Sequence, residues 1–320
     1  MNIVLTGSVA YDYLMSFPGY FKDHLLPDKL ESISLSFLVE SMVRRRGGTA
    51  PNIAYTMALL GERTRILATA GEDFEEYRLW LEAKGIDTSA VRVIPGEYTA
   101  SFFANTDRAN AQIASFYPGA MAHADELSLH ELDGDRPDLV VISPNEPKAM
   151  TRYVDECRQL GIPYLYDPSQ QIPRLDRDEL RRGVESALAL FVNDYELGMI
   201  HKHTGIALED VLNYPGFTVV TKGEFGATIY PQGEEIEIPI VEPERVIDPT
   251  GVGDAFRAGF LTGYSQRWDW RTCGQVGALA ATFCLEQQGP QGHEYSRVEF
   301  VTRYRRHFDD EEQLNTLLEA

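Results

Sequence analysis

Solidly apolar segments alternate with helical patterns along most of the chain. The apolar segments lie at residues 1–8, 65–71, 138–143, 163–168, 188–194 and 217–223. Helical spacing of apolar residues occurs at 51–61, 73–85, 147–160, 176–188 and 194–203. Strands without a polar face are buried on both sides. The alternation therefore predicts an α/β fold, with a mostly parallel sheet covered by helices on both faces.

Two further features extend this prediction. Residues 33–43 and 98–106 alternate apolar and polar positions, and residues 112–119 follow with a similar pattern. Alternation is typical of a sheet with one wet face, so these segments predict a small antiparallel layer over the main sheet, or else edge hairpins. Residues 253–320 have helical patterns, and one helix there is rich in small residues that allow close packing. No low-complexity linker or internal repeat divides the chain, so one domain over 1–320 is expected.

The charge of the chain excludes some classes of partner. It has 320 residues, 43% of them hydrophobic, and a formal net charge of −20. A duplex-binding protein carries a basic stripe, and the longest basic run here is only Arg44-Arg45-Arg46. We therefore expect neither a nucleic acid nor an anionic membrane as partner.

The cysteines and the N-terminus point to a reducing compartment. Cys157, Cys273 and Cys284 are odd in number and widely spaced, which argues against a disulfide framework or a zinc site. The first residues lack the basic and apolar regions of a signal peptide. No apolar run approaches the ~18 residues that a membrane helix needs. The expected location is cytoplasmic.

The segment 248–260, DPTGVGDAFRAGF, is the strongest candidate for chemistry. Gly251 and Gly253 remove side chains just before a predicted helix, where free amides and the helix dipole favour an anion. Asp254 then lies at the mouth of this anion cradle, which predicts a lowered pKa for its carboxyl. Phosphoryl transfer fits such a pair, because an aspartate orients the attacking hydroxyl while the amides hold the developing charge.

Simpler interpretations of the segment remain open. An aspartate near a helix N-terminus is a common cap. As a dinucleotide-binding fingerprint the segment is weak, since Phe256 takes the place of the third glycine and the segment comes late in the chain. Neither a Walker A sequence nor a His-Arg-Asp kinase loop is present, so those phosphoryl-transfer classes are excluded.

Four ordered blocks resemble the ribokinase-like sugar and nucleoside kinases. The blocks are RRRGGTAPNIAYTMALLG, NDYE (193–196), VTKGEFGA (220–227) and the segment 248–260, which has Val252 where the family usually has alanine. TGSVAYDYLMSFPG, SLSFLVE, QIASFYPGA and YDPSQQ are similar to the bacterial, actinobacterial-type adenosine kinases. The resemblance implies a three-layer α/β/α core with a β-sheet lid from roughly 13–46 and 97–117. It also implies Mg²⁺-dependent transfer of phosphate from ATP to the 5′-hydroxyl of adenosine, giving AMP.

The resemblance also implies roles for individual residues. Asp254 would be the base, and the anion hole would be formed by the amides of Gly251, Val252 and Gly253. Asp12 would hold the ribose hydroxyls, since a carboxylate accepts two hydrogen bonds. The other residues implied for the nucleoside are Gly48 and Asn52 at the ribose, Phe102 and Phe116 sandwiching the purine, and Ser8, Gln170 and Gln171 at the base. Those implied for the nucleotide are Thr221, Lys222, Gly223 and Glu224 along ATP, with Asn193 and Glu196 at the magnesium and its waters. Ser36 would reach a neighbouring subunit, which implies a homodimer built through the lids.

Each assignment has a plain structural alternative. Asp12 could cap a turn, the phenylalanines could be lid core, Asn193 could end a strand, and Gln170, Gln171 and Lys222 could be solvated. Two rival functions also remain: a kinase of the same family acting on another nucleoside or on a sugar such as ribose or fructose, and a nucleoside-binding or regulatory protein without turnover.

Overall fold

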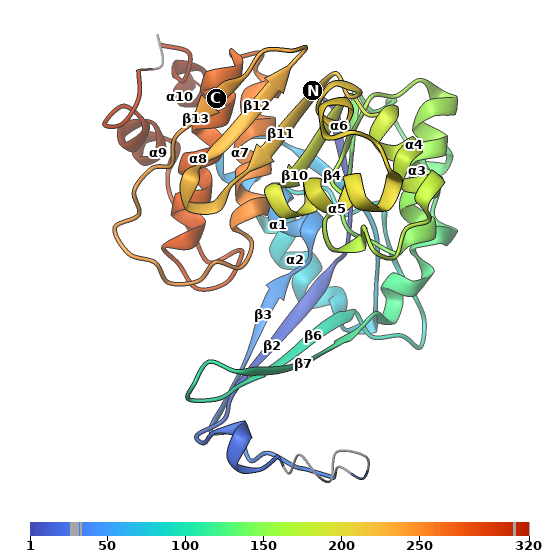
Figure 1. Ribbon diagram of the computed structural model, residues 1–320, viewed down its shortest axis with the longest axis vertical. Coiled ribbons are helices and arrows are strands. Elements are labelled where there is room, and N and C mark those ends of the chain that lie inside the picture. The colour runs from blue at the N-terminus through green and yellow to red at the C-terminus, as the bar shows by residue number, and fades with distance from the viewer. Residues whose placement is uncertain (26–31, 33, 310–311, 320) are drawn as a thin grey trace.

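A large α/β core and a small projecting β-sheet make up the molecule. The computed structural model describes residues 1–25, 32, 34–309 and 312–319. The small sheet extends from one end of the core, and both marked termini lie at the opposite end (Figure 1). We call the small sheet the lid.

In the described part of the chain, nine strands form the core sheet in the order β13-β12-β11-β10-β9-β8-β1-β4-β5. From β5 to β11 all neighbours pair in parallel, whereas β12 and β13 are antiparallel. Each predicted apolar segment supplies one of the parallel strands, which confirms the mostly parallel sheet. The strands are β1 (Ile3–Thr6), β4 (Thr64–Ala70), β5 (Val91–Val93), β8 (Leu139–Ile142), β9 (Tyr164–Tyr166), β10 (Ala189–Asn193), β11 (Phe217–Thr221), β12 (Ala227–Pro231) and β13 (Ile236–Ile238).

Helices cover both faces of this sheet, as the sequence predicts. The first face packs against α1 (Thr49–Leu59), α2 (Glu75–Ala83), α7 (Val252–Ser265), α8 (Trp270–Leu285), α9 (Arg297–Tyr304) and α10 (Asn315–Glu319). The second packs against α3 (Pro147–Leu160), α4 (Arg177–Glu185), α5 (Asp194–Thr204) and α6 (Leu208–Asn213). Short 3-10 turns lie at Phe21–Asp23, Glu72–Phe74, Gly119–Glu126, Leu129–Glu131, Ser169–Gln171 and Gly223–Phe225. No helix among the described segments is long and apolar enough to span a bilayer.

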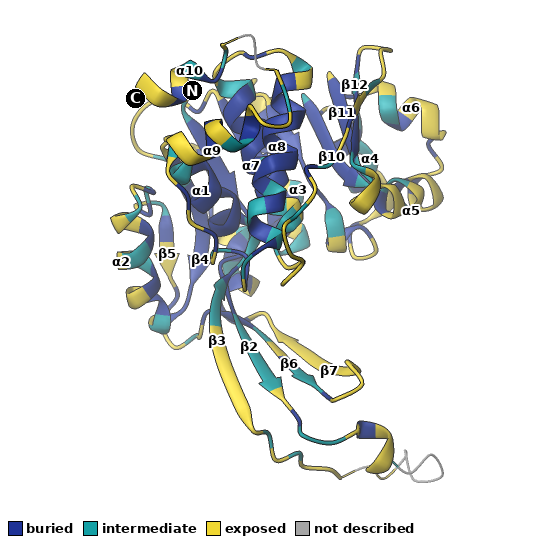
Figure 2. Cartoon of the chain, turned by 90° about the vertical axis from the view of Figure 1, so that its left-hand side faces the viewer, coloured by how far each residue is buried: buried dark blue, intermediate teal, exposed yellow. Residues whose placement is uncertain are grey.

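The lid consists of β2 (Ala10–Ser16), β3 (Ser41–Gly47), β6 (Ala100–Thr106) and β7 (Gln112–Tyr117), in the order β3-β2-β6-β7. Figure 2 shows that most of its surface is exposed or half-buried, in contrast to the dark core. The expectation of a purely antiparallel layer is wrong, because β2 and β6 pair in parallel. The lid has two antiparallel pairs, β2 with β3 and β6 with β7, which come from separate parts of the chain. Where the two pairs meet, β2 and β6 run in the same direction.

The alternation at 33–43 does not form a strand over its whole length. The strand β3 begins only at Ser41, residues 34–39 have no regular structure, and Ile33 lies outside the described residues. The apolar side chains here serve another purpose, since the ring of Phe37 packs edge-on against Phe17 and Phe21 at centroid distances of 5.0 and 4.9 Å. An aromatic cluster therefore produced the pattern that resembles a strand.

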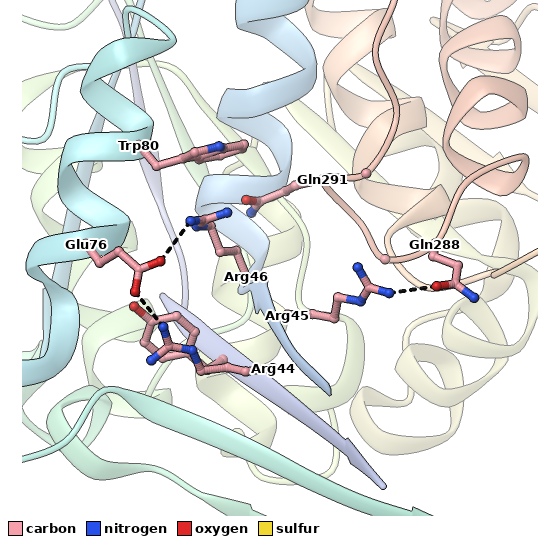
Figure 3. Close-up of a pocket in the computed structure, with 10 residues that line it drawn as sticks. Arg44, Arg45, Arg46, Glu76, Trp80, Gln288 and Gln291 are labelled. Atoms are coloured by element: carbon pink, nitrogen blue, oxygen red, sulfur yellow. Dashed lines mark hydrogen bonds and ion pairs between the residues drawn. The ribbon is translucent and has the colours of Figure 1, made fainter. Parts of the chain in front are cut away.

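The lid joins the core where β3 leads into α1. Arg44, Arg45 and Arg46 lie here, facing α2 and the segment 288–292 (Figure 3). The hydroxyl of buried Tyr77 in α2 donates to the Gly47 carbonyl at 3.0 Å, which fixes the end of the strand.

Candidate active site

A pocket of about 280 Å³ lies between the lid and the carboxyl ends of the core strands. From β1 the chain continues to β4 on one side, and it later returns to β8 on the other. Ligands of open α/β sheets bind at such a switch point. The amide of Ser8, after β1, donates to the carbonyl of Pro144, after β8, at 2.9 Å. The predicted residues that line the pocket are Ser8, Asp12, Gly48, Asn52, Phe102, Phe116, Gln170, Gly251 and Asp254.

Gly251 begins α7 in a conformation that only glycine adopts easily. Its φ is 80°, and a Cβ there would lie 2.3 Å from the Cβ of Pro290. The structure records no partner for the amides of Gly251 and Gly253 among the residues it describes, so both are available to an anion. The amide of Val252 differs from the expectation, because it donates to the Pro249 carbonyl at 3.3 Å and closes the turn.

Asp248 holds the glycine turn in place, although sequence reasoning assigned it no role. One carboxylate oxygen accepts from the amide of Thr250 at 2.9 Å, and the other accepts from the amide of Gly289 at 3.0 Å. The turn and the segment 288–292 are thereby fixed to each other.

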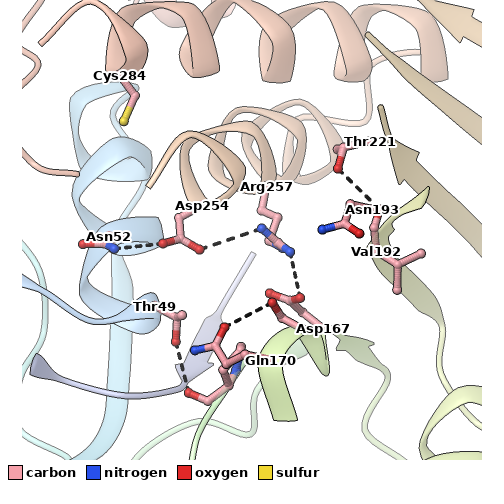
Figure 4. A network of polar contacts seen from close by, with 12 residues as sticks. Thr49, Asn52, Asp167, Gln170, Val192, Asn193, Thr221, Asp254, Arg257 and Cys284 are labelled. Carbon is pink, nitrogen blue, oxygen red and sulfur yellow. Dashed lines mark hydrogen bonds and ion pairs between the residues drawn. The ribbon is translucent and has the colours of Figure 1, made fainter. Parts of the chain in front are cut away.

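Asp254 lies at the centre of a buried polar network (Figure 4). Its Oδ2 accepts from Asn52 Nδ2 at 2.8 Å, and its Oδ1 lies 3.8 Å from Arg257 Nη1. Burial raises the pKa of the Asp254 carboxyl, while Arg257 and Asn52 oppose the rise. The predicted lowering of this pKa is therefore wrong: the loss of hydration outweighs the favourable donors. A raised pKa makes the carboxylate a stronger base than an ordinary aspartate.

Arg257 and Asp167 form a buried ion pair that sequence reasoning missed. Arg257 Nη2 donates to Asp167 Oδ1 at 2.7 Å, and the Asp167 side chain is only 1% exposed. Burial raises the pKa of Asp167 to about 7, opposed by Arg257 and reinforced by Glu196 and Asp254. The signal was in the sequence, because Arg257 follows Asp254 by three residues on one helix face and Asp167 directly follows a strand.

Gln291 sets the orientation of the Asn52 side-chain amide. Gln291 Nε2 donates to Asn52 Oδ1 at 2.8 Å and to the Tyr77 hydroxyl oxygen at 2.6 Å. Because the Asn52 oxygen is occupied by this donor, its NH₂ group faces Asp254. This arrangement favours the ionised form of the Asp254 carboxyl.

Asp12, Phe102 and Phe116 lie on one face of the lid. Asp12 pairs with Phe102 across β2 and β6, and Phe102 pairs with Phe116 across β6 and β7. Directly paired residues point to the same face, with Cβ atoms about 5 Å apart. The two rings therefore form one wall, and a base would lie across them; the expected sandwich does not fit this register. Burial, with Asp248 nearby, raises the pKa of Asp12 to about 6.

Gly48 brings the backbone close to the floor of the pocket. Its φ is 94°, and a Cβ there would lie 2.4 Å from the Ser8 carbonyl oxygen. The Ser8 hydroxyl accepts from the amide of Thr49 at 3.2 Å, so it holds the start of α1.

The two neighbouring glutamines have different surroundings. Gln170 lines the pocket, but Gln171 is buried outside the lining, where its Oε1 accepts from Arg174 Nη1 at 3.1 Å. Ser169, which has the strained φ of 37°, lines the pocket and was not predicted. Ser36 is exposed on the segment before β3, outside this pocket.

The residues expected along ATP follow β11, beside the end of β10. Asn193 pairs with Thr221 in the parallel register. Thr221 and Lys222 are half-buried, and Lys222 Nζ lies 3.2 Å from Glu237 Oε1. Gly223 and Glu224 are exposed. Thr221, Lys222, Gly223 and Glu224 do not line the pocket that contains Asp254.

Asn193 and Glu196 fit a magnesium ion only through water. They form a capping box, in which Asn193 Oδ1 accepts from the Glu196 amide at 2.7 Å and Glu196 Oε2 accepts from the Asn193 amide at 2.8 Å. Glu196 Oε1 accepts from the Ser169 hydroxyl at 2.9 Å. No set of three or more histidine, cysteine or acidic side chains in the described segments could hold a metal alone. Mg²⁺ usually keeps several waters and binds substrate phosphates, where it neutralises charge.

Comparison with known proteins identifies relatives over nearly the whole chain. A nucleoside kinase of Methanothermobacter thermautotrophicus is 30% identical over 306 residues, with 95% of each chain covered. The nucleoside kinase of Burkholderia thailandensis in complex with inosine has a TM-score of 0.86 and 36% identity, covering 96% of this chain and 98% of that one. The adenosine kinase of Sinorhizobium meliloti is similar in fold alone, with a TM-score of 0.74, 20% identity and coverage of 96% and 99%.

The model of the pfkB family carbohydrate kinases matches residues 10–295. That range contains both lid hairpins, the glycine turn and Asp254, so the match covers the features from which the pocket is built. The chain therefore belongs to the pfkB family of carbohydrate kinases, ATP-dependent enzymes that phosphorylate an alcohol group.

Proposed function

We propose that this protein is an ATP-dependent nucleoside kinase that phosphorylates the 5′-hydroxyl of purine nucleosides, adenosine and inosine among them. The observation that supports this most is the position of Asp254, which faces one pocket together with Asp12 and the two phenylalanines of the lid. A kinase site for a nucleoside requires a catalytic base for the hydroxyl, a carboxylate that accepts hydrogen bonds from the ribose hydroxyls, and an aromatic surface on which the nucleobase stacks.

Asp254 acts as the base in this proposal. The nucleoside hydroxyl lies against its carboxylate, which takes the proton as the oxygen attacks the terminal phosphorus of ATP. The bond from that phosphorus to the bridging oxygen breaks, and ADP leaves. Arg257 and Asn52 stabilise the ionised carboxylate before attack, and the amides of Gly251 and Gly253 hold the transferring phosphoryl group. The nucleotide would lie along residues 221–224. Asn193 and Glu196 would hold magnesium through water, and the ion would neutralise charge on the phosphates.

The lid selects the acceptor. Asp12 accepts hydrogen bonds from the ribose 2′- and 3′-hydroxyls, Gly48 allows the sugar close to the backbone, and the base lies across Phe102 and Phe116. Ser8 and Gln170 contact the base or sugar from the core side. Closure of the lid would exclude water and limit the hydrolysis of ATP.

A broad purine specificity is favoured over adenosine alone. Relatives at 30–38% identity have the name nucleoside kinase, and the Burkholderia enzyme has been solved in complex with inosine and with ADP-inosine. Stacking on two rings accepts any flat base. This supports the alternative that the sequence left open, a kinase of the same family acting on another nucleoside, over a kinase for adenosine alone.

The test is a coupled ADP-release assay with ATP and magnesium against adenosine, inosine, guanosine, cytidine, ribose and fructose. We expect turnover on adenosine and inosine, with the 5′-monophosphate as product. Turnover on ribose or fructose alone would leave the chemistry at Asp254 in place and overturn the nucleoside assignment. Binding of nucleosides without consumption of ATP would support the non-catalytic alternative.

We also propose that the protein forms a homodimer through its lids, with Ser36 near the partner's site. Leu38, just before β3, is 87% exposed and Met42, on β3, is 61% exposed, so pairing of the lids would cover apolar surface. Leu38→Asp should shift the protein from dimer to monomer in sedimentation, while Leu208→Asp, at an exposed leucine on α6, should not. A monomeric wild type would contradict the proposal.

A further inference from the structure

A second pocket lies beside the root of the lid (Figure 3). It has a volume of about 300 Å³ and shares no lining residue with the candidate active site. Its walls come from the end of β3, from α2 and from the segment 288–292. The side chains that give it its character are Arg44, Arg45, Arg46, Glu76, Trp80 and Gln291.

The lining of this pocket is basic in an acidic protein. It contains three guanidinium groups and a single carboxylate, that of Glu76, so its formal charge is +2, whereas the whole chain has −20. Arg44 and Arg46 both contact Glu76, with N–O distances of 2.6 and 3.2 Å. Arg45 donates to the neutral Gln288 Oε1, at 2.7 Å. Each guanidinium has five N–H donors, so most of the donors in this pocket remain for a ligand.

The arginines are held in place by aromatic rings. The Arg44 guanidinium lies 4.7 Å from the ring centroid of Tyr11, and that of Arg46 lies 4.8 Å from the ring of Trp80. A stacked guanidinium keeps its planar edge free to bind two oxygens at once, and little side-chain freedom remains to be lost on binding. Glu76 is a weak competitor, since its side chain is 66% exposed.

We propose that this pocket binds a phosphate dianion, either free or as the phosphate of a small ester, at a site separate from catalysis. Phosphate matches the site because its oxygens accept forked hydrogen bonds from several arginines and its double charge offsets theirs.

The pocket is connected to the candidate catalytic residue by hydrogen bonds. Gln291 lines the pocket and donates to Asn52 Oδ1 at 2.8 Å, and Asn52 donates to Asp254 Oδ2 at 2.8 Å. The Oε1 atom of Gln291 is buried and has no partner in the described parts of the chain. A ligand that shifts the segment 288–292 therefore changes the position of Asn52 against Asp254. This coupling rests on the proposed function of Asp254, whereas the binding itself does not.

Binding is tested by the fluorescence of Trp80 during titration with inorganic phosphate. The chain has two other tryptophans, of which Trp268 is buried and Trp270 is half-buried against the core. The variant Trp80→Phe measures the fluorescence of these two alone. Arg44→Gln with Arg46→Gln should weaken binding at least about tenfold. Glu76→Gln should strengthen it about threefold, which a purely structural arginine cluster would not do. The matched control Arg92→Gln breaks an exposed Arg–Glu pair elsewhere and should change nothing.

Each outcome of the titration decides the proposal. A saturable change that depends on the two arginines and grows with Glu76→Gln supports it. No saturable change in a folded wild type overturns it, as does binding that Arg44→Gln with Arg46→Gln leaves intact. A parallel titration with glycerol 3-phosphate separates the sources, since binding of inorganic phosphate alone identifies the free anion and binding of both identifies a phosphomonoester.

The coupling has a separate readout. Phosphate should change the kcat of the wild type, and Gln291→Met should bind phosphate with unchanged affinity but lose this response. If phosphate binds and kcat does not respond, the site stands and its link to Asp254 is refuted. If neither nucleosides nor sugars are turned over, the fluorescence titration still decides whether the site exists.

Discussion

The two sides of the candidate active site are built differently. On the core side, Asp254, Arg257 and Asp167 have side chains no more than 13% exposed, and each contacts another charged or polar group. On the lid side, Phe116 is 49% exposed and every residue of β7 is exposed. The core side is fixed by burial and by hydrogen bonds, while much of the lid surface is exposed to water.

This difference assigns a separate task to each side. Phosphoryl transfer requires charges held at fixed positions, which a buried network supplies. Choice of acceptor requires a surface that opens and closes, and weakly packed elements do so most easily. Changes in the core should therefore act on kcat, and changes in the lid should act on KM for the acceptor.

The largest expected effect is that of Asp254→Asn. Removing the base should lower kcat by about 10²–10⁴-fold, because proton transfer to a positioned side chain contributes that much. The measurement is ADP release with saturating adenosine, beside the control Asp135→Asn at an exposed site. Turnover within a few-fold of the wild type would remove Asp254 from the mechanism.

Gly251→Ala comes next, because it forces a Cβ against Pro290 and displaces an amide of the anion hole. The free energy of unfolding should fall by about 2 kcal/mol or more, and kcat by about 10²-fold. Gly96→Ala is the matched control, since Gly96 has a φ of 79° but a Cβ there meets no atom within 4 Å. That control should cost about 1 kcal/mol in urea unfolding. Equal losses in both variants would mean that contact with Pro290 is unimportant.

Phe102→Ala should act on the acceptor alone. Loss of one stacking ring should raise KM for adenosine and inosine by about tenfold or more and leave KM for ATP unchanged. Phe103→Ala is the control, because Phe103 is the next residue of β6, on the opposite face, where its ring stacks on Tyr13 at a centroid distance of 4.8 Å. An equal effect of both changes would indicate general damage to the lid.

The smallest effect concerns pH. Burial raises the pKa of Asp12 to about 6 in the free protein, so its carboxyl is mainly ionised at pH 7 and about a tenth ionised at pH 5. If the carboxylate holds the ribose hydroxyls, the affinity for nucleoside should fall about tenfold from pH 7 to pH 5, as measured by calorimetric titration. Asp12→Asn should bind more weakly at pH 7 and lose this slope. A slope that persists in Asp12→Asn would have another origin.

The sequence predicted six of the parallel core strands well because each of these six is a solid apolar segment, whereas β5, β12 and β13 were not predicted. Burial on both faces demands such segments, and glycine ended the helices where the patterns ended. The same physics placed Gly251 and Asp254 at the start of α7. Of the nine predicted residues that line the pocket, Asp12, Phe102 and Phe116 come from the lid and the other six come from the core.

The features that the sequence did not predict have a common physical cause: they depend on contacts between residues far apart in the sequence, or on burial. The ion pair of Arg257 with Asp167 joins residues 90 positions apart, and Gln291 reaches Asn52 across 239. The raised pKa of Asp254 depends on how deeply it is buried, which no local pattern reveals. Beside the lid, Phe37 packs in an aromatic cluster, and its apolar position made the sequence pattern resemble a strand. The register of β6 with β7 places Phe102 and Phe116 on the same face, which the sequence alone could not show.

The most direct test of the division between core and lid is one series of calorimetric titrations with adenosine and inosine. The series compares the wild type with Asp254→Asn and Phe102→Ala. The account predicts that Asp254→Asn binds both nucleosides within a few-fold of the wild type while its turnover is lost, and that Phe102→Ala binds both about tenfold more weakly or worse. Loss of nucleoside binding in Asp254→Asn together with normal binding in Phe102→Ala would contradict it.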